Sequence, residues 1–139
     1  MKQREPVSTI MTHELYKLNL SDSLFKAKEI FDKHHLRHLP VVNGDHLVGI
    51  ISLTDIMRIS FGSNFGDDQR EVDTAIFEML NIDQVMKHHP KTVESSTPIK
   101  EVAEILSKEE FHSLPVTNDG HLVGIVTTTD VIKYLLQQY

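Results

Sequence analysis

The chain has 139 residues, of which 40% are hydrophobic and 24% are charged, and its formal net charge is −6. This length allows one compact domain or two small units that share a core. The scattered lysines and arginines argue against nucleic-acid binding, which needs many cations to neutralise phosphates. The chain has no cysteine, which excludes disulfides and fits a cytoplasmic location. No apolar run approaches the roughly 20 residues that cross a bilayer, and the N-terminus has no secretory apolar region, so we expect no membrane contact.

The sequence contains an internal duplication. Leu39-Pro40-Val41 recurs 75 positions later as Leu114-Pro115-Val116, and His46–Ile50 recurs as His121–Ile125 without a gap. A repeat of this kind decides the architecture before any local pattern does, because each copy is too small to bury its own apolar faces. We therefore expect an α/β (α+β) fold in which two β-α-β-β-α motifs pack sheet to sheet with pseudo-two-fold symmetry. The expected parts are a first motif at 1–61, a linker loop and helix at 62–81, and a second motif at 82–139.

The first copy predicts six elements in chain order. Val7–Met11 forms a helical turn, and an extended stretch follows around Tyr16–Leu20. The spacing of Leu24, Ala27 and Phe31 then indicates an amphipathic helix. Two short strands joined by a tight turn at 43–45 come next, followed by a last helix near Thr54. The ranges expected for the two strands are His38–Val42 and Leu47–Ser52.

The second copy and the linker predict the remaining elements. In copy two the corresponding helical turn is Ile82–Met86, and the last helix begins near Thr129. We expect Asp22 and Thr97 to cap the amphipathic helices, with Pro98 in the first helical turn of the second one. An apolar face predicts a further helix in the linker that ends at Asn81; it consists of Val72, Ala75, Ile76, Met79 and Leu80.

One polar pattern follows a buried strand in both copies. Gly49 is followed by Ser52 and then Asp55, and the second copy has Thr127 and Asp130 at the same spacing. One interpretation is a capping box, in which the hydroxyl and the carboxylate bond to each other's backbone amides. The other is a ligand site, in which the hydroxyl donates to a phosphate and the carboxylate accepts hydrogen bonds from a ribose diol. The two roles are compatible, so the sequence leaves both open.

The order of these motifs, found twice, resembles the CBS motif pair, also called a Bateman module, in its stand-alone bacterial type. The resemblance covers nearly the whole chain and implies a regulatory module that binds AMP, ADP, ATP or S-adenosylmethionine in the cleft between the motifs. It implies that the carboxylates hold the ribose and that the hydroxyls lie near the ribose or phosphate. The residues concerned are Ser52, Thr54 and Asp55 in one site and Thr127, Thr129 and Asp130 in the other.

The resemblance also implies roles for residues around these sites. Arg37 and His38 in copy one, and His112 in copy two, take positions that reach the ligand's phosphates. This asymmetry indicates that the two sites differ in phosphate preference. Adenine is expected beside the first strands, at Leu15, Tyr16, Pro90 and Lys91. For each of these residues the plain alternative is a solvated side chain or ordinary core packing.

Catalytic and metal motifs are absent from the sequence. There is no phosphate-binding glycine loop and no nucleophile elbow, so we expect no enzyme activity and no required cofactor. His34 and His38 would share a face only on a continuous helix, which Pro40 argues against, so we expect no metal site. We expect a homodimer that signals to an unknown protein in trans. Two alternatives remain: a dimerisation scaffold without a ligand, and a metal-responsive regulator that uses the histidines.

Overall fold

The computed structural model describes residues 4–13, 15–59 and 75–139. The chain forms two compact units. One consists of Tyr16–Pro90 and is called here the Asp55 unit. The other combines Met1–Leu15 with Lys91–Tyr139 and is called the Asp130 unit. The repeats of the sequence and these units divide the chain differently, because each unit takes the beginning of the other repeat.

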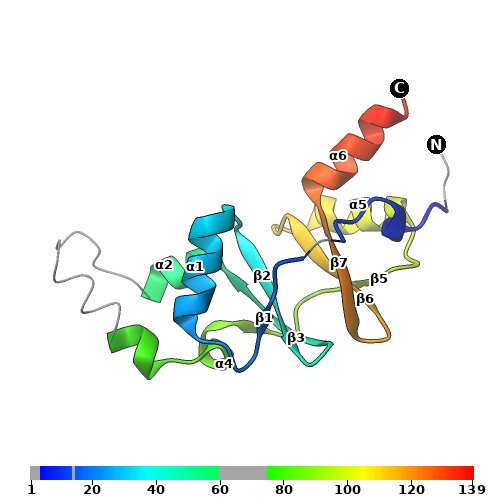
Figure 1. Cartoon of the computed structure of the whole chain (residues 1–139). Helices are drawn as coiled ribbons and strands as arrows, with labels where there is room; N and C mark the ends of the chain where they lie inside the picture. The colour runs from blue at the N-terminus through cyan, green and yellow to red at the C-terminus, as the bar shows by residue number, and fades with distance from the viewer. Residues whose placement is uncertain (1–3, 14, 60–74) are drawn as a thin grey trace. The chain divides into compact units, whose positions relative to one another are not determined.

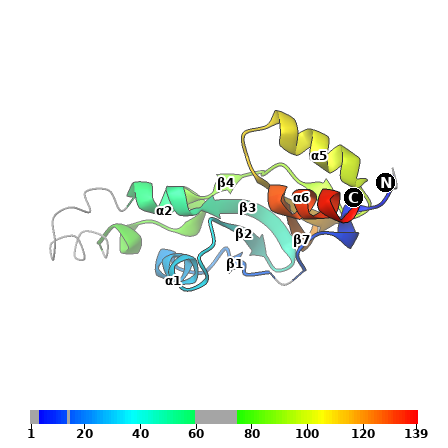
Figure 2. The ribbon, with the colours of Figure 1, turned by 90° about the horizontal axis from the view of Figure 1, so that it is seen from above.

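The Asp55 unit is a four-stranded sheet with helices (Figures 1 and 2). Its strands follow the order β1-β2-β3-β4, with β1 parallel to β2 and the other pairs antiparallel. Helix α1 buries one apolar face against β2 and β3, and it also contacts α2. The elements are β1 (Leu18–Asn19), α1 (Leu24–His34), β2 (His38–Asn43), β3 (His46–Ser52), α2 (Leu53–Ile59), α4 (Ile82–Val85) and β4 (Lys87–His88).

The Asp130 unit repeats this plan with three named strands. They run in the order β5-β6-β7, and Thr12 pairs with Ile125 on β7, so the N-terminal segment takes the place that β4 has in the Asp55 unit. Helix α5 contacts α6, and its Val102 is buried with residues of β6 and β7. The elements are η1 (Val7–Thr9), β5 (Val93–Glu94), α5 (Ile99–Lys108), β6 (Ser113–Asn118), β7 (His121–Thr127) and α6 (Thr128–Gln137).

The two hairpins show why the sequence folds in this register. Gly44 has φ 65° in the first turn, and Asp119 and Gly120 have φ 52° and 84° in the second. Glycine and aspartate tolerate this left-handed region, which a two-residue hairpin requires. Both hairpins contain an irregularity at the same place, between Val41 and Val42 in the first and at the corresponding position of the second. The mixed α/β fold and the duplicated element order that the sequence predicts are confirmed.

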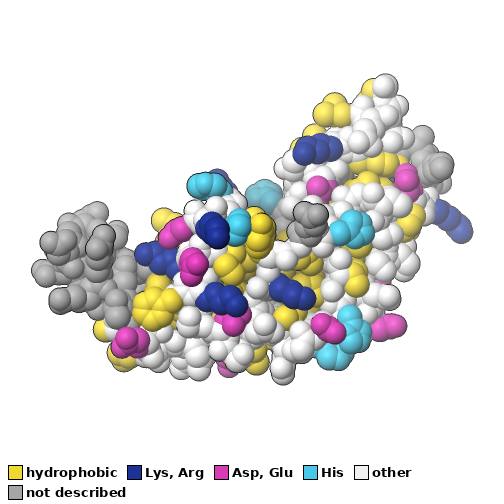
Figure 3. All heavy atoms as spheres, viewed as in Figure 1, with side chains coloured by type: hydrophobic (Ala, Val, Ile, Leu, Met, Phe, Trp, Pro, Cys, Tyr) yellow, Lys and Arg dark blue, Asp and Glu magenta, His cyan; other side chains and the backbone are white. Residues whose placement is uncertain are grey.

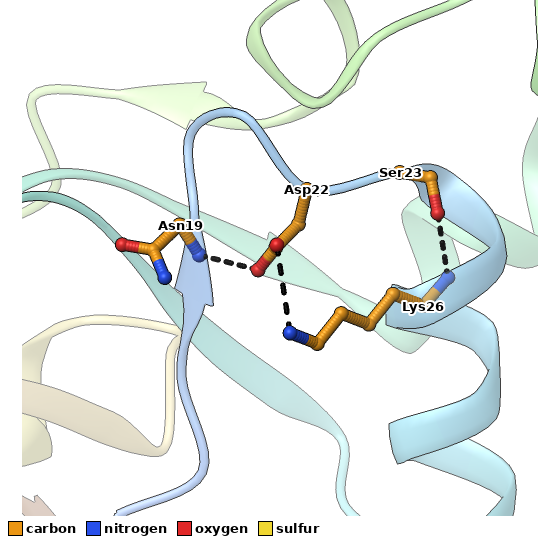
Figure 4. Close-up of polar contacts among 4 residues, drawn as sticks. All are labelled: Asn19, Asp22, Ser23 and Lys26. Carbon is orange, nitrogen blue, oxygen red and sulfur yellow. Dashed lines mark hydrogen bonds and ion pairs between the residues drawn. The ribbon is translucent and has the colours of Figure 1, made fainter.

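The predicted helix caps are wrong in both copies. Ser23, not Asp22, caps α1 by accepting a hydrogen bond from the Lys26 amide at 3.1 Å (Figure 4). The Asp22 carboxylate instead accepts from the Asn19 amide at 2.8 Å and contacts Lys26 Nζ at 3.5 Å, because it closes the turn that precedes the helix. In copy two, α5 begins at Ile99 after Pro98, and no side chain caps it. The predicted N-cap position is therefore one residue too early in each copy.

The linker helix is only partly described. Residues 75–79 are helical, whereas the predicted positions 72–74 lie outside the described residues. Asn81 does not end this helix as its last residue. It caps the next one, α4, through a capping box in which Asn81 Oδ1 accepts from the Gln84 amide at 2.9 Å.

The first segment of each repeat, called here its leader, ends at Leu15 in the first repeat and covers residues 82–90 in the second. Each leader is fixed by a methionine that packs on a glycine. In the Asp55 unit, a Cβ on Gly49 would collide with Met86 Sδ and would lie 2.9 Å from the Lys87 carbonyl oxygen. In the Asp130 unit, a Cβ on Gly124 would lie 2.5 Å from Met11 Sδ. Close backbone approach explains the glycine in each strand. The leader of each repeat thus completes the unit that contains the other repeat's hairpin.

Candidate functional site

The two strand–helix junctions form the same polar arrangement. At the Asp55 junction, residues 52–55, Asp55 Oδ2 accepts from the Ser52 amide at 2.9 Å, and Ser52 Oγ accepts from the Asp55 amide at 3.0 Å. At the Asp130 junction, residues 127–130, the matching distances are 3.0 and 3.1 Å to Thr127. All four side chains are half-buried. Both junctions are therefore complete capping boxes.

The residues before each Leu-Pro-Val lie beside these junctions. The Arg37 carbonyl accepts from the Leu53 amide at 2.8 Å, and the His112 carbonyl accepts from the Thr128 amide at 2.9 Å. In the strand register His38 stands opposite Ser52, and Ser113 stands opposite Thr127. Arg37 and His112 are exposed and His38 is half-buried. The structure thus brings these three predicted residues next to the predicted hydroxyls.

The four residues expected near adenine fall into different units. Pro90 belongs to the Asp55 unit and Leu15 to the Asp130 unit, and both are half-buried. Tyr16 and Lys91, which follow them, each begin the next unit and are exposed. The Tyr16 ring stacks on His34 with ring centroids 3.8 Å apart. The leader of each repeat belongs to the unit that contains the other repeat's junction. The leader in the same unit as Asp55 is therefore the one that ends at Pro90, which an alignment of the two copies alone does not reveal.

Other predicted residues take simpler positions. Thr54 and Thr129 lie in the first turns of α2 and α6 and are exposed. Helix α1 ends at His34, and His35 follows with φ 54°, so His34 and His38 lie on different elements. Within the described residues there is no group of three or more potential metal ligands. In the same residues no helix is long and apolar enough to cross a membrane.

The sequence did not predict two cations on segments that border the Asp55 junction. Arg58 Nη1 lies 3.5 Å from Asp55 Oδ1, and Lys87 pairs with Ile50 in the strand that leads to the junction. The i,i+3 spacing of Asp55 and Arg58 on a helix was a usable signal for the first contact. Lys87 had no such signal, because its position depends on the exchange of the leaders.

A family comparison agrees with this arrangement. The model of the CBS domain matches residues 7–62 and 82–137, which together make up most of the chain. The chain therefore belongs to the CBS domain family, as a tandem pair of CBS motifs. Stand-alone CBS pairs are regulatory modules.

Individual relatives span the same pair. A CBS domain-containing protein of Dictyostelium discoideum is 29% identical over 94% of this chain and 91% of its own length. The crystal structure of CBSX2 of Arabidopsis thaliana in complex with AMP is 28% identical, with a TM-score of 0.78 over 95% of this chain and 96% of that one. The CBS pair of protein MJ0100, in complex with 5′-methylthioadenosine and S-adenosyl-L-methionine, is 26% identical with a TM-score of 0.74, over 97% and 98% of the two chains.

In other relatives the matching part is a fraction of a longer protein. The chain covers 24% of an inosine-5′-monophosphate dehydrogenase of Thermoplasma acidophilum and 14% of an A-adding tRNA nucleotidyltransferase of Geobacter sulfurreducens. In those enzymes the CBS pair is a side domain.

Proposed function

We propose that this chain is a regulatory module that binds an adenosine-type ligand, with no catalytic activity of its own. The observation that carries the proposal is the duplicated junction, in which a hydroxyl and a carboxylate are held together at the end of a buried strand in both units. AMP and S-adenosylmethionine in two related CBS pairs support the ligand class. ADP and ATP share the same adenosine part and remain within the proposal.

The chemistry of the junction fits a ribose. Each carboxylate uses Oδ2 for the capping bond. The other oxygen is held by no hydrogen bond within the described residues, although Arg58 approaches it in the Asp55 unit. A carboxylate accepts from two hydroxyls, so Asp55 and Asp130 are suited to a ribose diol. Ser52 and Thr127 are placed to share a hydrogen bond with the same ligand. We assign Thr54, Thr129, Arg37, His38 and His112 to its phosphate end, and Leu15, Tyr16, Pro90 and Lys91 to its base.

The regulatory step follows from linkage. A ligand shifts a conformational equilibrium only by as much as it binds one state better than another. A ligand bound at a junction is also expected to contact the leader that the other repeat contributes to the same unit. Ligand binding is therefore coupled to the pairing between one repeat's hairpin and the other repeat's leader. The regulated partner is proposed to be a separate protein that acts in trans. The lack of cysteine fits a cytoplasmic setting.

The first test is a thermal-shift panel of AMP, ADP, ATP and S-adenosylmethionine. It compares the wild type with an Asp55→Asn, Asp130→Asn double variant. A ligand at about 100 times its dissociation constant should stabilise the fold by roughly 2.7 kcal/mol. We expect this shift in the wild type and its loss in the double variant, whose amide oxygens still accept the capping bonds.

A matched control separates capping from binding. Asn81→Ala removes a capping box of the same type at α4, at a residue not assigned to the ligand, and should cost about 1 kcal/mol without changing the ligand shift. A ligand shift that survives in the double variant, or no shift with any of the four ligands, would overturn the proposal.

A second function has its own observation. The boxes are complete without a ligand, and α6 exposes an apolar stripe, so a scaffold that pairs with a second copy of this chain is also supported. Ile132, Leu135 and Leu136 are 51%, 39% and 68% exposed and share one helix face. Hydrophobic side chains reach the surface along α6 (Figure 3). Light scattering after gel filtration should give a dimer for the wild type and a monomer for Leu136→Glu, and a wild-type monomer would rule this function out.

A further inference from the structure

The two junctions carry very different charge. We propose that ligands with a phosphate group select the Asp55 junction, whereas the Asp130 junction favours adenosine derivatives without one. The inference rests on the proposed function, and it names the ligand class for each site. It is drawn from the side chains that surround the two carboxylates within each unit.

Three permanent cations lie on segments that border the Asp55 junction. Arg58 lies 3.5 Å from the Asp55 carboxylate with 72% of its side chain exposed, so its guanidinium faces both the carboxylate and solvent. Arg37 is exposed, and its carbonyl is bonded to the amide of Leu53, directly after Ser52. Lys87 is exposed and pairs with Ile50 on the strand that ends at Ser52. Arg58 contacts the Asp55 carboxylate, and the backbones of Arg37 and Lys87 pair with residues on either side of Ser52.

Of the three equivalent positions around the Asp130 junction, only one carries a permanent cation. Thr12 stands where Lys87 stands in the other unit, because it pairs with Ile125. His112 replaces Arg37, with its carbonyl bonded to Thr128, and the chain before it carries Glu109 and Glu110, which are exposed. Lys133 replaces Arg58, and among the described residues it has no ion pair with Asp130 comparable to the Arg58 contact.

The difference matters because phosphate recognition depends on cations. Arginine binds phosphate through two parallel charge-assisted hydrogen bonds, which neutral groups do not replace. A monophosphate carries close to two negative charges, so it gains from three cations and loses near a pair of glutamates. Adenosine has no such charge and gains only from the carboxylate and the residues assigned to its base. The same ribose site thus becomes a nucleotide site in one unit and a nucleoside-type site in the other.

The experiment measures AMP and adenosine by isothermal titration calorimetry on single-junction variants. Asp130→Asn leaves the Asp55 junction intact, and Asp55→Asn leaves the Asp130 junction intact. We expect AMP to bind about tenfold or more tightly than adenosine in the first variant, and no better than adenosine in the second. The preference in the first variant should weaken as salt rises, because exposed charges are screened.

Matched charge variants locate the effect. Arg58→Gln or Lys87→Gln, added to Asp130→Asn, should weaken AMP about fivefold and leave adenosine within about twofold. Lys133→Gln, added to Asp55→Asn, should change either ligand by less than about twofold. Melting curves of each variant confirm that it is folded.

The outcomes distinguish this inference from the proposed function. Equal AMP preference at both junctions, or a preference that survives Arg58→Gln and Lys87→Gln together, overturns the inference while the module still binds adenosine ligands. If neither AMP nor adenosine binds the wild type, the inference fails, and the thermal-shift panel with ADP, ATP and S-adenosylmethionine decides separately whether the proposed function also fails.

Discussion

The Asp55 unit and the Asp130 unit share their backbone pattern but differ in the side chains that hold it. In the Asp55 unit, helix α1 contributes Phe31, which is 2% exposed, to the hydrophobic core. Phe77 is buried in the same cluster. The equivalent of Phe31 in the Asp130 unit is Leu106, which is only partly buried. The Asp130 unit instead has a polar anchor, because Tyr134 Oη donates to Glu5 at 2.7 Å.

This comparison separates two kinds of position. The glycine under each methionine and the hydroxyl–carboxylate pair at each junction are kept in both copies, since they fix the backbone. The core aromatics and the charges around the carboxylates differ between the copies, since the fold tolerates several residue types at those positions. A duplication therefore preserves the geometry of a site while its ligand preference is free to diverge.

The largest expected effect tests the difference between the cores. Phe31→Ala should lower the free energy of unfolding by about 3–5 kcal/mol, because a buried aromatic leaves a cavity. Leu106→Ala should cost only about 1–2 kcal/mol, because less of its surface is removed from water. Urea denaturation followed by circular dichroism measures both. Equal losses would mean that the two cores are equally packed, against the difference in burial.

The next effect tests what the units share. Gly49→Ala and Gly124→Ala should each cost about 1–3 kcal/mol, because a methionine can move but the leader's backbone carbonyl cannot without breaking strand pairing. The control is Gly44→Asn, at a turn where nothing lies within 4 Å and asparagine tolerates the left-handed backbone. It should stay within about 0.5 kcal/mol of the wild type. A neutral Gly124→Ala would show that the N-terminal leader is not held as β4 is.

The polar anchor gives a pH-dependent difference. The hydrogen bond to Glu5 raises the pKa of Tyr134 above its ordinary value of 10.0, with burial and the Glu5 charge adding to the effect. A raised folded-state pKa contributes stability that is complete below pH 10.0 and is lost as pH rises toward the folded pKa. The melting temperature of the wild type should therefore exceed that of Tyr134→Phe at neutral pH, and the gap should shrink above about pH 10.

The matched position in the other unit is Ile59, which does not titrate. Ile59→Val should lower the melting temperature by an amount that is the same across this pH range. A constant gap for Tyr134→Phe as well would mean that the contact with Glu5 does not stabilise the neutral tyrosine.

The sequence predicted much of this fold because the duplication doubles every signal. The turn asparagines Asn43 and Asn118, the Leu-Pro-Val strands and the junction hydroxyls occur at the same offset, so each pattern was supported twice. What it missed depends on contacts between distant segments. An alignment places Met86 over Met11 but does not say which glycine each one meets, so the pairing of Lys87 with Ile50 was not predicted. The predicted cap at Asp22 was wrong for a local reason, since its carboxylate accepts from the Asn19 amide and Ser23 caps the helix instead.

The smallest expected effect concerns the charges themselves. The Arg58–Asp55 contact is 3.5 Å long and Arg58 is 72% exposed, so screening by water leaves it worth only about 0.2–0.5 kcal/mol. Arg58→Gln should cost that much in low salt and nothing at about 1 M NaCl, where exposed charges are screened. Lys133→Gln should cost nothing in either condition. Such a small stabilisation does not explain an arginine on an already complete cap, because the Ser52–Asp55 box closes without it. If Arg58→Gln proved as costly as a core substitution, Arg58 would be structural and the charge difference between the junctions would need no ligand. A near-neutral result means that Arg58 is not needed for stability, and the calorimetry with AMP and adenosine then tests its role toward phosphate.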